Sequence, residues 1–195
     1  MSVADLEHLA QDLVLFGVMP LWMAAGFADW LCHRRMRIER SSGLPETLLH
    51  MLMLAEMATA TLAAAFLQIN ALVVAIMIGA FVLHELTVYV DLRYGSTRRD
   101  IPPIEQLVHS FLEFVPVIGA ALVLLFHWSA VESLFGAGTA DFALRLKPAP
   151  LPFGGMAALA GAMLVLVVLP YAEELWRCWR ERTVPVASRD PRSGA

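Results

Sequence analysis

Histidines and carboxylates of this chain gather near the same ends of four long apolar segments. His33, His50, His84 and His109 each lie within a few residues of such an end, and acids accompany all four. An ionisable side chain inside a bilayer is costly unless it is paired, hydrated or bound to a metal. The clustering therefore predicts a buried site that handles metal ions or protons.

Helical spacing places these acids and imidazoles on shared faces. Residues four apart project from the same side of a helix, and Glu46 precedes His50 by that interval, as Glu105 precedes His109. A stripe of this kind would be too costly facing lipid, so the stripes should converge inside a bundle. We predict metal ligands at Asp29, His33, Glu46, His50, His84, Glu85, Glu105 and His109, with Glu56, Asp91 and Glu113 as bridging or orienting groups.

The ligand types favour two metal ions. Carboxylates can bridge cations and balance their charge, while imidazole nitrogen suits iron, manganese or zinc. In this inventory the chain resembles the ferritin-like di-metal carboxylate proteins, although those use Glu-x-x-His with ligands three residues apart. The resemblance covers only the ligand set and implies iron first, with manganese and zinc as alternatives. In its general features the chain also resembles a family of bacterial multi-pass membrane proteins, which implies the bacterial inner membrane.

Composition indicates what must position these residues. Of 195 residues, 58% are hydrophobic and 16% charged, and the mean hydropathy of +0.65 is typical of an integral membrane protein. An apolar helix of about 20 residues crosses a bilayer. We predict an all-α bundle with about five such spans: Leu13 to Leu31, Thr47 to Leu67, Ala71 to Val90, Ile104 to Trp128 and Leu151 to Tyr171.

Basic residues predict the orientation. Arginines follow the first, third and fifth segments, whereas the other connections carry only Arg145 and Lys147. By the positive-inside rule the N-terminus lies outside and the C-terminus in the cytoplasm. We expect one membrane domain, with a site-bearing four-helix bundle over 1–128, an outer loop over 129–150, the fifth span over 151–171 and a tail over 172–195. Prolines at Pro20 and Pro116 predict kinks.

Several residues are assigned ordinary roles. Glu173 and Glu174 fall in the predicted tail, and their spacing to Arg177 does not match the membrane CAAX-protease motif. His127 is predicted to lie at the outer interface and His8 in solvent. No run of like charge is long enough to bind nucleic acid, so nucleic acid is excluded as a partner.

These features predict a di-metal, di-iron-like oxidoreductase that acts on a lipid-soluble substrate near the cytoplasmic leaflet, with membrane lipids and an electron donor as partners. A zinc centre would instead activate water for lipid hydrolysis. A proton or divalent-cation transporter remains an alternative, although the outer half of the bundle is poor in polar groups. Haem held by two of the histidines is a weaker hypothesis, because buried anions beside a porphyrin gain nothing. A structural polar layer in a non-catalytic subunit is the last alternative.

Overall fold

The computed structural model describes residues 2–148 and 153–182, and helices make up most of these residues. In chain order the elements are α1 (Val3–Leu13), the π-helical η1 (Val14–Val18), α2 (Met19–Met36), the short 3₁₀ turn η2 (Ile38–Arg40), α3 (Leu44–Phe66), α4 (Ala71–Ser96), α5 (Pro103–Phe126), α6 (Trp128–Leu134), α7 (Phe153–Met163), the π-helical η3 (Leu164–Val168) and α8 (Leu169–Arg182).

Within this described part, five helical stretches are long and apolar enough to cross a membrane. They are Asp5–Met36, Leu44–Phe66, Ala71–Ser96, Pro103–Phe126 and Gly154–Arg182. The prediction of an all-α bundle with about five spans is therefore confirmed, and the chain is a multi-pass membrane protein. Residues 151 and 152 of the predicted fifth span, and residues 183–195 of the predicted tail with Arg189 and Arg192, lie outside the described residues.

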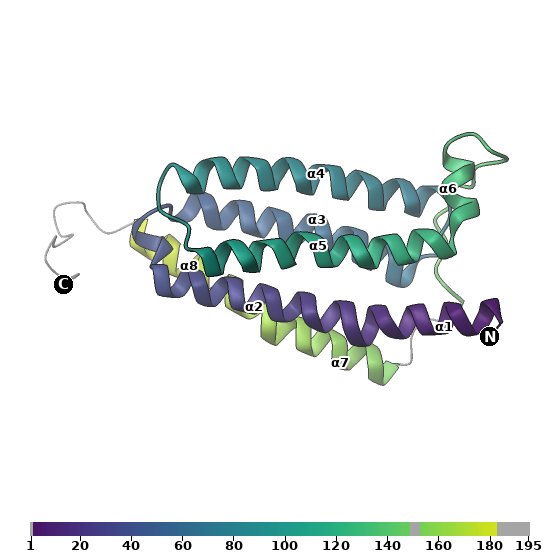
Figure 1. Cartoon of the computed structure of the whole chain (residues 1–195), viewed down its shortest axis with the longest axis horizontal. Helices are drawn as coiled ribbons and strands as arrows, with labels where there is room; N and C mark the ends of the chain where they lie inside the picture. The colour runs from purple at the N-terminus through teal and green to yellow at the C-terminus, as the bar shows by residue number, and fades with distance from the viewer. Residues whose placement is uncertain (1, 149–152, 183–195) are drawn as a thin grey trace, which may run out of the picture.

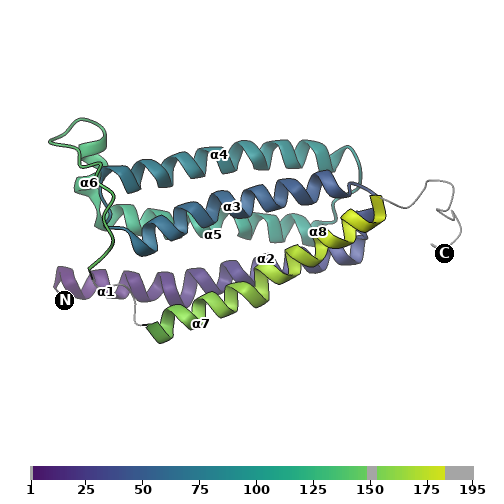
Figure 2. The same cartoon turned by 180° about the vertical axis from the view of Figure 1, so that it is seen from behind.

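The five spans run side by side along the long axis of the molecule (Figures 1 and 2). α3 and α4 form an antiparallel hairpin, α2 packs beside α5, and α8 packs against both α2 and α3. The N-terminus and α6 lie at one end (Figure 1), whereas Arg34, Arg99 and Arg177 belong to helix ends and a loop at the other. We call this second end the basic end of the bundle.

Each π-helical segment ends two residues before a proline. Pro20 follows η1 and Pro170 follows η3, and each proline lacks the N–H that would bond the carbonyl four residues earlier. A π-helical turn widens the helix, so the chain passes the proline ring without ending the span. α5, by contrast, continues through Pro116 as one α-helix. The first and fifth spans are therefore each one continuous helix with a local π-helical segment.

At the end opposite the basic end, the chain after α6 is tied to the α3–α4 turn. The backbone N–H of Gln68 donates to Arg145 O at 2.9 Å, and that of Lys147 donates to Phe66 O at 2.8 Å. The Asn70 side chain caps α4 and also donates to Ala143 O at 2.8 Å. The outer segment thus lies across the hairpin and satisfies backbone groups there.

Small residues allow the hairpin helices to approach closely. Ala60 and Ala63 of α3 form a buried cluster with Val73, Met77 and Ala80 of α4. Small side chains at a membrane helix interface let backbones pack tightly. This packing fixes the register of α3 against α4, and so the relative height of the polar residues nearer the basic end.

Candidate metal centre

Five helices bring polar side chains together toward the basic end. The return from α2 to α3 depends on two residues with positive φ, Arg37 at 52° and Gly43 at 64°. Arg37 ends α2 in the left-handed conformation, and Gly43 supplies a conformation that other residues avoid. This tight return places the first turn of α3 beside the last turns of α2.

His33 of α2 is the centre of the polar layer. Its side chain is completely buried, and three carboxylates from three helices surround it. His33 Nδ1 lies 2.9 Å from Oε2 of Glu174 on α8. His33 Nε2 lies 3.3 Å from Oε1 of Glu105 on α5 and 3.5 Å from Oδ1 of Asp29, one turn earlier on α2.

Glu174 connects two imidazoles. Its second oxygen, Oε1, lies 3.3 Å from His50 Nδ1 and accepts a hydrogen bond from Thr47 Oγ1 at 3.1 Å. The His33 and His50 rings stack with centroids 4.6 Å apart. His50 Nε2 lies 3.4 Å from Asp91 Oδ1 of α4, so His50 links α8 to α4.

Asp29 connects α2 to α5 and α8. His109 Nε2 lies 2.9 Å from Asp29 Oδ1 and 3.9 Å from Glu105 Oε1. The other oxygen of Asp29 accepts a hydrogen bond from the Tyr171 hydroxyl at 2.9 Å. Tyr171 is itself buried, so this bond holds the Asp29 carboxylate in one orientation.

Arg99, in the α4–α5 loop, closes the layer at the basic end. Its side chain is 5% exposed and lies 2.6 Å from Glu46 Oε1 and 2.5 Å from Glu105 Oε1. Burial lowers the pKa of Arg99, but hydrogen bonds to Glu105 and Glu46 outweigh burial and raise that pKa above its ordinary value. Arg99 therefore stays charged and compensates part of the buried negative charge.

Substituting Arg99 by alanine should destabilise the fold. Removing one partner of a buried ion pair leaves uncompensated charge, here on Glu46 and Glu105, and costs about 3–5 kcal/mol. Arg98→Ala is the matched control, because Arg98 is exposed and stacks over Tyr94. Unfolding of both variants in mixed detergent micelles measures the difference, and equal stabilities would contradict a role for this ion-pair cluster.

Two overlapping groups of side chains could hold a metal ion. Asp29, His33, Glu105 and His109 form one, and His33, Glu46 and His50 form the other. Within each group one ligand atom per residue lies within 4.8 Å of all the others. His33 belongs to both groups. The structure thus brings together six of the eight predicted ligands.

Hydrogen bonding alone does not satisfy this layer. Asp29 Oδ1, His33 Nε2 and Asp91 Oδ1 are buried and make no hydrogen bond of acceptable geometry within the described chain, despite their short distances to neighbouring polar atoms. Buried polar atoms in native proteins nearly always have a partner. Buried polar atoms that lie close together without hydrogen bonding one another are the arrangement expected of ligands around a cation.

The other two predicted ligands, His84 and Glu85, lie outside both groups. His84 is buried about two helical turns before Asp91 on α4, with Nδ1 3.8 Å from Glu56 Oε2, and Glu56 accepts a hydrogen bond from Thr87 at 2.8 Å. Glu85 is exposed on the other side of α4. The next residue on a helix is rotated by about 100°, and on α4 this rotation takes Glu85 away from the buried side that holds His84.

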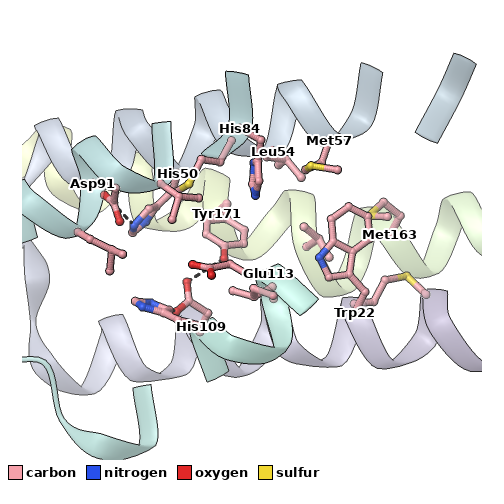
Figure 3. A pocket seen from close by; sticks show the side chains of 18 residues that line it. Trp22, His50, Leu54, Met57, His84, Asp91, His109, Glu113, Met163 and Tyr171 are labelled. Carbon is pink, nitrogen blue, oxygen red and sulfur yellow. Dashed lines mark hydrogen bonds and ion pairs between the residues drawn. The ribbon is translucent and has the colours of Figure 1, made fainter. Parts of the chain in front are cut away.

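The three residues predicted to bridge or orient are found in different settings. Asp91 contacts His50 directly, whereas Glu56 forms the separate pair with His84. Glu113 is half-buried, and its side chain lines a cavity of about 100 Å³ that adjoins the layer. Figure 3 shows this cavity, with Asp91, His50 and His109 toward one end and Trp22 and Met163 toward the other.

The sequence prediction missed the contribution of α8. Glu174, assigned to the tail, is completely buried between His33 and His50, and Tyr171 bonds Asp29. The sequence did contain a signal for this face: the i, i+3, i+7 spacing of Tyr171, Glu174 and Cys178. In the structure all three of these residues are buried. The predicted span ended at Tyr171, so this face was not recognised.

Comparison of the chain with protein-family models, with curated proteins and with solved structures finds no match. The class of the protein therefore follows from its own fold and site. The chain is a multi-pass helical membrane protein with a buried group of histidines and carboxylates that could hold a metal ion.

Proposed function

We propose that this protein is a membrane-embedded di-metal oxidoreductase, with iron as its metal, that acts on a lipid-soluble substrate near the cytoplasmic leaflet of a bacterial inner membrane. The observation that carries the proposal is the pair of overlapping ligand groups that share His33. Carboxylates of these groups would bridge two adjacent cations, while the His33 imidazole, which has one free nitrogen lone pair, would bind one of them.

The charge of the layer supports two divalent cations. Among the described residues, five acids are buried here, and Arg99 is the cation that pairs with two of them. The acids are Asp29, Glu46, Asp91, Glu105 and Glu174. If the imidazoles are neutral, as metal ligands must be, five negative charges and one positive charge leave four negative charges in a poorly solvated region. Two divalent cations would cancel this excess, and bare buried charge is strongly unfavourable.

The donor set supports iron or manganese over softer ions. Both groups consist of carboxylate oxygen and imidazole nitrogen, and neither contains a thiolate. When bound, two such ions would supply redox chemistry. The chain's own residues would orient the ligands: Tyr171 fixes Asp29, Thr47 donates to Glu174, and Arg99 holds Glu105.

The alternatives are less well supported. A transporter needs polar groups across the membrane, but on the outer side of the layer lies a cavity with a mostly apolar lining, which includes Val18, Met57 and Val123. A haem would require histidines free of anions, whereas His33, His50 and His109 each contact a carboxylate. Zinc-dependent lipid hydrolysis uses the same donor types, and metal identity separates it from the main proposal.

Elemental analysis with an optical spectrum of detergent-purified protein tests the proposal. We expect about two iron or manganese ions per chain, as in di-metal carboxylate bundles, and no Soret band. The double variant His50→Ala, His109→Ala should lose the metal. His127→Ala should keep it, because His127 lies at the outer end of α5 and contacts Val123 O. Stoichiometric zinc would redirect the function to hydrolysis, and metal-free wild-type protein would overturn the proposal.

A further inference from the structure

A second, larger cavity lies on the outer side of the metal-site cavity. It has a volume of about 390 Å³ and is lined mainly by the first span, α3, α5 and α7, with Met77 from α4. Trp22 and Met57 line both cavities, so the two meet there. In Figure 3 both labelled side chains lie at the end away from Asp91 and His50. The two cavities together form a slot that ends at the polar layer.

The slot is long and apolar. Along the continuous first span its lining extends from Trp22 to Glu7, about 22 Å at 1.5 Å per residue. Small or aliphatic side chains dominate this lining, among them Val18, Ala60, Ala120 and Val123. Polar groups line it mainly near the outer end, where Gln11, His127 and Lys147 are found. This shape and chemistry fit an extended hydrocarbon chain.

The cavity beside the metal ligands is narrow by comparison. Its volume of about 100 Å³ is about a quarter of that of the second cavity. The end of an unbranched alkyl chain fits this space. Asp29, His50 and His109 line it together with Glu113, so whatever enters lies directly against the ligand groups.

From these observations we infer that the slot binds one linear alkyl chain of a long-chain lipid and presents the end of that chain to the metal centre. The inference rests on the proposed function, because it makes the alkyl chain the substrate of the metal centre. Binding of the alkyl chain can nevertheless be measured without turnover. Trp22 and Met57 contact the chain where the two cavities join.

Quenching of Trp22 fluorescence tests this binding. The probe is stearic acid brominated at mid-chain, added to full-length protein in phosphatidylcholine nanodiscs, and the Trp22 signal is the difference between wild type and Trp22→Phe. Ala120→Phe places a ring in the slot, whereas Ala121→Phe places the same ring on the exposed side of α5. We expect Ala120→Phe to weaken binding about tenfold or more, equivalent to about 1.4 kcal/mol, and Ala121→Phe to leave it unchanged.

The measurements test the alkyl-chain inference and the proposed function separately. Equal quenching in Ala120→Phe and Ala121→Phe, or displacement of the probe by a short-chain benzoquinone, would overturn the alkyl-chain inference. Ala65→Phe fills the same slot from α3 and replaces Ala120→Phe if that variant does not fold. Metal content is measured on every sample. Metal-free protein that still binds the probe would contradict the proposed function but support the alkyl-chain site.

Discussion

Replacing His33 by alanine is expected to abolish binding of both metal ions. His33 belongs to both ligand groups and contacts three carboxylates, so its loss takes a nitrogen donor from one cation and releases carboxylates that position the other. We do not expect a nearby carboxylate to replace the lost imidazole, because a carboxylate adds negative charge and supplies no nitrogen donor. Elemental analysis of the purified variant should give less than about a tenth of the wild-type metal content, since removal of even an orienting group typically costs 10–100-fold in affinity.

Single substitutions of the other two histidines separate the groups. His109→Ala removes a ligand from the group with Asp29 and Glu105, and His50→Ala removes one from the group with Glu46. Each should therefore retain about half of the metal that the di-metal stoichiometry predicts. His84→Ala is a demanding control, because His84 is buried nearby yet lies outside both groups. Metal loss in His84→Ala equal to that in His33→Ala would contradict this assignment.

Replacing Glu174 by glutamine should destabilise the bundle more than the same change at the adjacent Glu173. Glu174 is completely buried and contacts His33, His50 and Thr47 through both of its oxygens. A neutral amide of similar shape cannot accept at both positions, and the loss should cost about 3 kcal/mol. Glu173 pairs with Arg34 at the surface, where an ion pair contributes about 1 kcal/mol or less.

Unfolding of both variants in mixed detergent micelles, with and without added metal, measures this difference. The Glu174→Gln deficit should widen when metal is present, because wild type gains binding free energy that the variant loses in part. Glu173→Gln should respond to metal as wild type does. A Glu174→Gln variant that is as stable as Glu173→Gln under both conditions would mean that α8 does not contribute to the centre.

The elements and the height of the polar layer were predictable from sequence. Hydrophobic length gave the spans, and the four-residue spacings of Asp29 with His33, Glu46 with His50, and Glu105 with His109 correctly indicated shared faces. These signals are local, since each depends only on the rise and rotation of one helix. Local periodicity was therefore enough to single out the six residues that form the two candidate groups.

The remaining members of the candidate site depend on tertiary packing. Glu85 was assigned with His84 on depth alone, but rotation about α4 puts Glu85 on the exposed side. Glu174 was missed because charged residues after Tyr171 marked the end of the apolar stretch, although the helix continues to Arg182. Which neighbour a buried carboxylate meets depends on how helices pack, and a single sequence contains no direct record of that packing.

The position of Glu174 on α8 has a consequence for biosynthesis. Asp29, His33, Glu105 and His109 come from α2 and α5, so this ligand group can assemble once α5 has entered the membrane. The carboxylate that joins His33 to His50 is translated later, and domains emerge from the ribosome in chain order. We therefore expect nascent chains to pass through a stage in which one group is complete while His33 and His50 still lack their shared carboxylate.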